Sequence, residues 1–277
     1  MCWMCDKYGE GGLWYLNPKL YARQMYKLRE PGKGPTEYGQ VGLREKPPIT
    51  RSELLRIRND EPERYPEALA VFNDDISNHA AGQAITLQEA RKIADIGAPM
   101  ASMMCVCRQI DRAFEERNEM EYSCLGTGVG MFKWERWPER YKGGVHFMPP
   151  DEVKEWLEKW NKRGFMHLIM TVGIGYIEGI CNCEYPACAA IRERLDLGVE
   201  SLLKGHYIAR VDYASCNGCG ICVQRCQFGA AKYEVRIDKA NIDPMRCFGC
   251  GLCETECPRS AITMIDKTSL PGMREVW

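Results

Sequence analysis

The chain has 277 residues, and its 37 lysines and arginines nearly balance its 38 aspartates and glutamates. A balanced charge creates no basic field for nucleic acid or for an anionic membrane surface, so we expect neither partner. The 45% hydrophobic and 27% charged residues are ordinary for a folded protein and exclude wholesale disorder. Sixteen cysteines are unusual for this length, and they direct the rest of the interpretation.

The start of the chain and its apolar stretches indicate a compartment. The first residues lack the basic and apolar regions of a secretion signal. The longest apolar stretch, residues 165–177, is shorter than the about 20 residues that a membrane helix needs. We therefore expect a cytoplasmic protein without a membrane span, whose cysteines stay reduced and hold metal rather than form disulfides.

Residues 1–80 are polar and are interrupted by many prolines and glycines. They are predicted to form an irregular N-terminal arm, with short helices near residues 19–28 and 51–58. An arm of this kind is a candidate docking segment for a partner. Its aromatic residues are the candidate docking surface: Trp3, Trp14, Tyr15, Tyr21 and Tyr26.

Residues 81–205 alternate helical and strand-like patterns. Thr86 and Glu89 have the spacing of a capping box, which predicts a helix that ends at Gly97. Further elements are predicted as helices over residues 150–163 and 186–197 and as a strand over residues 165–172, which a glycine-rich turn connects to the cysteine-containing segment 180–183. The alternation predicts a small α/β or α+β domain that carries several cysteines.

The C-terminal part contains an internal repeat. The spacing C-x2-C-x2-C-x3-C begins at Cys216 and recurs from Cys247. Three closely spaced thiolates can reach three irons of a cubane cluster, and the fourth iron takes its thiolate from the other repeat. Zinc would explain pairs of cysteines but not the third cysteine or the x3 spacing. The glycines between the cysteines are expected to adopt positive φ in tight turns: Gly218, Gly220, Gly249 and Gly251.

We therefore predict two [4Fe–4S] clusters in this part of the chain. The first would be held by Cys216, Cys219, Cys222 and Cys257. The second would be held by Cys226, Cys247, Cys250 and Cys253.

Residues 206–266 resemble a two-cluster bacterial ferredoxin domain, including the Pro258 that follows Cys257. The chain departs from the family at Gln227, where a proline usually follows the cysteine. The resemblance implies two antiparallel pairs of strands with short helices around the clusters. We predict an α+β protein overall, with a ferredoxin-like domain over 206–277, the cysteine-rich α/β domain and the N-terminal arm.

Eight cysteines lie outside the repeat: Cys2, Cys5, Cys105, Cys107, Cys124, Cys181, Cys183 and Cys188. The segments C-x-C-R from Cys105 and I-C-N-C from Ile180 resemble segments of ferredoxin-like proteins from anaerobes. That resemblance extends over roughly residues 86–266 and implies a shared shape for this region.

The eight upstream thiols could hold two further clusters, for a total of four. One partition groups Cys105, Cys107, Cys124 and Cys188, and it leaves Cys2, Cys5, Cys181 and Cys183 for the other cluster. Exchanging Cys188 with Cys181 or Cys183 is equally compatible with the sequence. Zinc binding, or packing of some thiols as small buried hydrophobes, are the alternatives.

Other residues near the cysteines give weaker signals. Arg108 either offsets the charge of a cluster or is solvated. The scattered histidines, His206 among them, are expected in the core or at the surface rather than as ligands. Two glycine-rich segments, residues 126–130 and 173–179, lack the pattern of a phosphate loop and are predicted to be turns.

These patterns favour an electron-transfer protein or subunit that relays electrons to or from a larger oxidoreductase. A redox protein is therefore the expected partner. The alternative is a reductase whose upstream cluster has an open coordination position for a substrate, although the sequence has no recognisable acid–base set. A third reading is a zinc scaffold upstream, with redox activity confined to the C-terminal domain.

Overall fold

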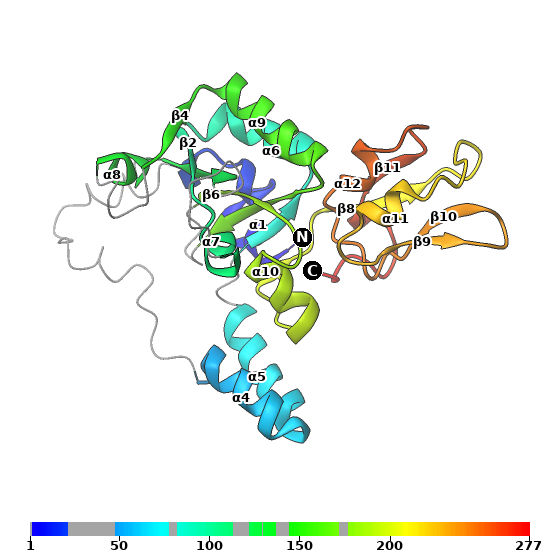
Figure 1. Cartoon of the computed structure of the whole chain (residues 1–277), viewed down its shortest axis with the longest axis horizontal. Helices are drawn as coiled ribbons and strands as arrows, with labels where there is room; N and C mark the ends of the chain where they lie inside the picture. Colours follow the sequence, from blue (N-terminus) through cyan, green and yellow to red (C-terminus); the bar gives the residue numbers. More distant parts are fainter. Residues whose placement is uncertain are drawn as a thin grey trace.

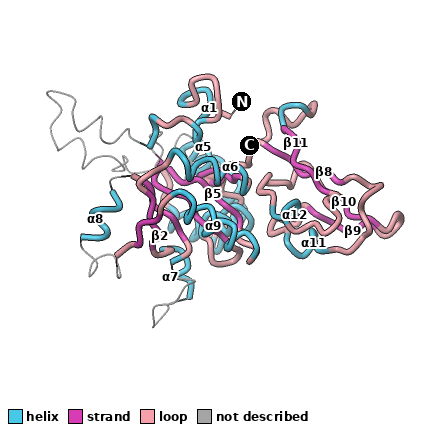
Figure 2. Tube along the Cα trace, turned by 90° about the horizontal axis from the view of Figure 1, so that it is seen from above, coloured by secondary structure: helices cyan, strands magenta, loops and turns pink. Residues whose placement is uncertain are grey.

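The computed structural model describes residues 2–21, 48–77, 82–112, 122–128, 130–136, 144–171 and 177–277. Within them, a larger part is built around one mixed sheet, and a smaller C-terminal part lies beside it (Figure 1, Figure 2). Tyr26 and parts of the predicted helix over 19–28 and of the glycine-rich segments lie outside the described residues.

Seven strands form the larger sheet, in the order β4-β2-β3-β6-β5-β1-β7. The strands are β1 (Gly82–Ile85), β2 (Met100–Met103), β3 (Cys124–Thr127), β4 (His146–Met148), β5 (Met166–Thr171), β6 (Ile177–Cys183) and β7 (Leu202–Leu203). Among these strands, β1 and β7 pair in parallel and the other neighbours are antiparallel. Antiparallel pairing therefore makes this part α+β rather than α/β, the second of the two classes that the sequence allowed.

Helices α6 (Leu87–Ile96) and α9 (Pro150–Lys162) pack against each other and cover one face of the sheet (Figure 1). The predicted capping box of α6 is present, since Thr86 and Glu89 each accept a hydrogen bond from the backbone N–H of the other. The apolar stripes of both helices pack with Ile169 and Ile180 of the sheet in one hydrophobic core.

The first described residues also belong to this core. Helix α1 (Trp3–Tyr8) leads to a short 3-10 turn, η1 (Trp14–Leu16), and both Trp14 and Tyr15 are fully buried. The indole of Trp14 donates to Oε1 of Gln83 in β1 at 2.7 Å. The expectation that Trp14 and Tyr15 form a docking surface is therefore wrong, because the core of the sheet covers both side chains.

The described residues of the segment 48–77 are mainly helical rather than irregular. They form α4 (Arg51–Asp60), the turn η2 (Pro62–Arg64) and α5 (Tyr65–Ser77). Thr50 caps α4, in agreement with the helix predicted here. This pair of helices packs around Val199, just before β7.

The opposite face of the sheet carries shorter helices and most of the upstream cysteines. These helices are α7 (Val106–Arg112), α8 (Gly130–Arg136) and α10 (Ala189–Arg192), and a π-helical turn, η4 (Glu193–Leu197), continues α10. The predicted helix over 186–197 begins later than expected, at Ala189, with Cys188 as its N-cap residue.

The C-terminal part contains two small antiparallel sheets, as the resemblance implies. Strand β8 (Tyr207–Val211) pairs with β11 (Ile262–Asp266), and β9 (Ala231–Glu234) pairs with β10 (Lys239–Ile242). Two short helices, α11 (Ile221–Arg225) and α12 (Leu252–Thr255), follow the cysteine loops, and a turn, η5 (Lys267–Ser269), follows β11. In the described part of the chain, no helix combines the length and apolar character that crossing a membrane requires.

Candidate metal centres

The eight cysteines of the repeat lie in two groups of four. Each group lines its own cavity of about 20 Å³, and each receives its fourth thiol from the other repeat. The first group is Cys216, Cys219, Cys222 and Cys257. The second group is Cys226, Cys247, Cys250 and Cys253. These are the groups that the spacing predicts, and four convergent thiols are the donor set that a [4Fe–4S] cluster requires.

Tight turns bring the thiols of each loop together. Gly218 and Gly249 occupy equivalent places in the two loops and have φ of +72° and +69°. A Cβ atom would lie 2.4 Å from the Asp238 carbonyl oxygen at the first position and 2.2 Å from that of Tyr207 at the second. The predicted positive φ is therefore confirmed, and neither turn has room for a side chain.

Backbone N–H groups donate to the sulfurs in a matching pattern. The N–H of Ala230 lies 3.3 Å from Sγ of Cys226, and the N–H of Ala261 lies 3.3 Å from Sγ of Cys257. Such hydrogen bonds stabilise the thiolate and help to set the potential of a cluster. Both cysteines are the last of their repeat, so the two halves present their donors in the same way.

Residues 215–261 match the 4Fe-4S dicluster domain family. The match contains all eight cysteines of the repeat and supports a ferredoxin-like domain with [4Fe–4S] clusters and a role in electron transfer. The upstream cysteines lie outside it. The search of curated proteins found no match to the chain.

Upstream of the dicluster domain, six cysteines line a single cavity of about 390 Å³. We call this group the six-thiol cavity; its cysteines are Cys105, Cys107, Cys124, Cys181, Cys183 and Cys188. Cys2 and Cys5 lie elsewhere, against His206. The partition that places Cys2 and Cys5 with Cys181 and Cys183 is therefore wrong, because the N-terminal segment packs on the other core.

The sheet explains how these thiols meet. Alternate residues of a strand face the same side, so Cys181 and Cys183 of β6 point together into the cavity. Leu125 of β3 pairs with Ile180 of β6, and the next position in this register places Cys124 beside Cys181. The helices supply the other three cysteines, from the start of α7 and the N-cap of α10.

Neighbouring thiols of the cavity shift one another's pKa, in the order Cys105, Cys124, Cys181, Cys183, Cys188 and Cys107. The neighbouring thiols Cys124 and Cys183 lower the pKa of Cys181 to about 6. The neighbouring thiol of Cys124, together with burial, raises the pKa of Cys105. Metal ligands must be deprotonated, so metal binding here would release protons.

Arg108 is a buried cation at the wall of the six-thiol cavity, with only 1% of its surface exposed. Its Nε lies 3.3 Å from a carboxylate oxygen of Glu184, and it also donates to Ser123. Its guanidinium carbon lies 4.9 Å from the ring centroid of Phe165. Solvation, one of the two roles open from the sequence, is therefore excluded, and the guanidinium is a buried positive charge that is paired with Glu184 at the wall of the cavity.

A buried polar network supports the back of β6. The Nδ1–H of His167 donates to Oδ1 of Asn182 at 2.7 Å, and Asn161 donates to Nε2 of His167 at 3.3 Å. Asn182 in turn donates to the carbonyl of Ser123 at 2.5 Å. Burial lowers the pKa of His167 to about 4, so this imidazole is neutral at pH 7. The network fixes the side chain of Asn182, which lies between Cys181 and Cys183 in the strand.

The six-thiol cavity and the dicluster domain share a buried contact. The rings of Phe228 and Phe248 stack with centroids 4.0 Å apart, and they belong to the same hydrophobic cluster as Cys183 and Cys188. Two cysteines of the second group, Cys226 and Cys250, pack against that cluster.

Gln227, the departure from the ferredoxin pattern, lies at this contact. Its amide donates to the carbonyls of Gly164 at 2.8 Å and Cys183 at 3.3 Å, and its oxygen accepts from the Tyr185 N–H at 2.8 Å. A proline could make none of these bonds. The sequence marked Gln227 as unusual but gave no sign of its partners, which come from a region more than forty positions away.

Proposed function

We propose that this protein is an iron–sulfur electron-transfer protein, in which the six-thiol cavity holds a further iron–sulfur centre that exchanges electrons with the dicluster domain. The observation that carries the proposal is the shared hydrophobic cluster of Phe228 and Phe248, which reaches Cys183 and Cys188 on one side and Cys226 and Cys250 on the other. Centres that lie close together across packed protein can exchange electrons without exposure to water.

The residues of the chain would hold and screen these centres. A bound [4Fe–4S] cluster supplies reversible one-electron transfer. The two groups of four thiols would each hold one cluster, and a set drawn from the six upstream thiols would hold the third. Arg108 would offset the negative charge of the upstream centre, while the stacked phenylalanines exclude water between the two regions.

We also propose the domain division and the setting of this function. Residues 206–277 would form the ferredoxin-like domain, residues 81–205 the cysteine-rich domain, and residues 1–80 an N-terminal segment. The relay would serve a redox protein or a larger oxidoreductase complex, in the cytoplasm of an anaerobic cell. The support for a redox partner is the relay itself, since it needs both a donor and an acceptor.

Metal analysis of the full chain, purified without oxygen, tests the proposal. We expect clearly more than about eight iron atoms per chain with matching acid-labile sulfide, because two cubane clusters account for about eight. After reduction, the EPR spectrum should contain signals broadened by spin coupling between neighbouring clusters. About eight iron atoms, with zinc or free thiols in the six-thiol cavity, would contradict the upstream centre.

A second candidate function is a reductase with a substrate-binding upstream centre. Cys107 and Ala187 line both the six-thiol cavity and a second cavity of about 500 Å³ between α4 and α10. The six-thiol cavity is also far larger than either dicluster cavity, which leaves space for a molecule beside a metal centre. Cyanide, as a small probe ligand, would change the EPR signal of an iron with an open position. An unchanged signal favours simple electron transfer.

A further inference from the structure

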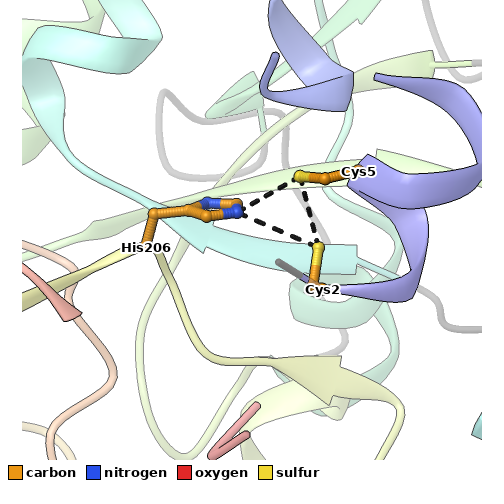
Figure 3. Close-up of side chains that lie close together, drawn as sticks. All are labelled: Cys2, Cys5 and His206. Atoms are coloured by element: carbon orange, nitrogen blue, oxygen red, sulfur yellow. Dashed lines mark hydrogen bonds between the residues drawn. The ribbon is translucent and has the colours of Figure 1, made fainter. Parts of the chain in front are cut away.

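A third cluster of metal-binding side chains lies apart from the thiol cavities described above. Sγ of Cys2 and Sγ of Cys5 are 3.4 Å apart, and Nε2 of His206 lies 3.9 Å from the first sulfur and 3.3 Å from the second (Figure 3). All three side chains are buried. The two cysteines come from the start of α1, whereas His206 lies between β7 and β8, at the entrance to the C-terminal part.

We propose that Cys2, Cys5 and His206 bind a zinc ion. Zinc bonds of about 2.3 Å to sulfur and about 2.0 Å to nitrogen place ligand atoms about 3.8 Å (S to S) and about 3.5 Å (S to N) apart in a tetrahedron. The three observed separations of 3.3, 3.4 and 3.9 Å fall around these values. Three protein ligands leave one position for water or another small donor.

The hydrogen bonds of His206 give independent support, because they fix its tautomer. The hydroxyl of Tyr15 donates to Oε1 of Glu89 at 2.5 Å, so its oxygen accepts from Nδ1–H of His206, at 2.9 Å. The lone pair of the imidazole is then on Nε2, which points at the two sulfurs (Figure 3). Metal-bound histidines typically donate their other N–H to a carboxylate or another acceptor in this way.

The surroundings of the sulfurs also suit thiolates bound to a cation. The side-chain amide of Gln83 lies 3.9 Å from Sγ of Cys2 as a donor, and its orientation is fixed by its bonds to Trp14 and to the Lys204 carbonyl. The carboxylate of Glu89 is held at the N-terminus of α6 by the backbone N–H and the hydroxyl of Thr86, both at 2.9 Å. The side chains that orient Cys2 and His206 are therefore themselves fixed by hydrogen bonds.

The site would connect segments that are far apart in the chain. Cys5 and His206 are separated by about two hundred residues, and a metal bond between them closes a very long loop. The zinc would thus hold the N-terminal segment against the start of the ferredoxin-like part. This role needs no redox change, and it does not depend on what the six-thiol cavity binds.

The test is zinc and iron content of the full chain purified without oxygen, with zinc X-ray absorption on the same sample. We expect about one zinc per chain, bonded to two sulfurs and one imidazole nitrogen, while iron remains fully loaded. The variants Cys5→Ser and His206→Ala should retain less than about a tenth of that zinc. Absence of zinc, retention of zinc in both variants, or a zinc with four sulfur ligands would overturn the proposal.

Two further variants decide the matter if those proteins fold poorly. His206→Cys should keep the zinc and raise the number of sulfur ligands from two to three, and an unchanged sulfur count would overturn the proposal.

Tyr15→Phe should weaken zinc binding by about 10- to 100-fold in competition with a chelator, because the hydrogen bond that orients the imidazole is lost. The matched control is Tyr21→Phe, which removes another buried hydroxyl, bonded to the Tyr15 carbonyl. An equal effect of both tyrosine variants would contradict the positioning role of Tyr15.

Discussion

The dicluster domain and the six-thiol cavity gather cysteines in different ways. In the dicluster domain, three of each four thiols come from one loop with positive-φ glycines, and the cavity fits closely around them. In the six-thiol cavity, the thiols come from two strands and two helix starts, around a far larger space. A loop motif thus defines its ligand set almost alone, whereas a sheet-built site depends on strand register and on the packing of helices.

The largest effect should come from removing thiols in each region separately. The double variant Cys181→Ser/Cys183→Ser should lose the iron in excess of about eight atoms per chain and keep the ferredoxin-type EPR signals. Cys250→Ser should lose or alter one cluster of about four irons and leave the upstream iron in place. Iron and sulfide analysis measures both. If the double variant keeps all its iron, the six-thiol cavity does not hold the additional iron.

Replacing the buried arginine should be the next largest effect. Arg108→Met should lower the free energy of unfolding by about 3 kcal/mol, because it leaves the buried partners of the guanidinium unsatisfied. Urea titration without oxygen measures the change. The control is Arg163→Met, an exposed arginine over the Trp160 ring, for which we expect at most about 0.5 kcal/mol. Equal effects of the two substitutions would contradict a special role for Arg108.

The contact between the two regions can be weakened at Gln227. Gln227→Ala removes three hydrogen bonds to the cysteine-rich region, and about 2 kcal/mol of stability should be lost. Electron exchange between the dicluster clusters and the upstream centre should slow, with iron content unchanged. Freeze-quench EPR follows this exchange, and Gln224→Ala, at an exposed position of α11, is the matched control. An unchanged rate of electron exchange would mean that Gln227 does not fix the position of the dicluster domain relative to the cysteine-rich region.

The smallest effect concerns pH. His167 is neutral in the folded protein with a pKa of about 4, below the value of about 6.5 expected in the unfolded chain. The unfolded state therefore binds the proton first, so the stability contributed by His167 is complete above about pH 6.5 and is lost as the pH falls towards 4. Between pH 7 and pH 5.5 we expect a loss of about 1 kcal/mol.

Urea titrations at the two pH values, with His167→Gln as the variant, measure this contribution. The variant should lose less stability than the unsubstituted protein over that interval. A pH dependence that survives in His167→Gln would assign it to other groups.

The sequence predicted the dicluster region well because its information is local. Cysteine spacing and glycine positions define the loops, and the structure agrees on the strands, on the positive φ and on which thiols lie together. The capping box of α6 was equally local and is confirmed. The grouping of the upstream thiols could not be predicted from local sequence patterns. It depends on the pairing of β3 with β6 and on the packing of the apolar side chains of residues 2–21 in the core of the sheet.

Two residues show most clearly what the sequence alone could not predict. His206 appeared as one scattered histidine, and its neighbours Cys2 and Cys5 are about two hundred positions away. Arg108 could be charged and solvated or charged and buried, and only the packing of Phe165 and Glu184 decides between these. The I-C-N-C segment did carry one usable signal, since alternation along a strand already implies that its two thiols share a face.

Strand β6 therefore tolerates changes in length very unevenly. Beyond the irregularity in register opposite Met170 and Thr171, deleting or inserting one residue between Ile180 and Cys181 would turn Asn182 towards the six-thiol cavity and turn both thiols towards α9. A change of two residues would restore the orientation of the side chains and shift only their position along the strand. Variation in length among homologues should accordingly be found outside β6, and between Ile180 and Cys183 only in even steps.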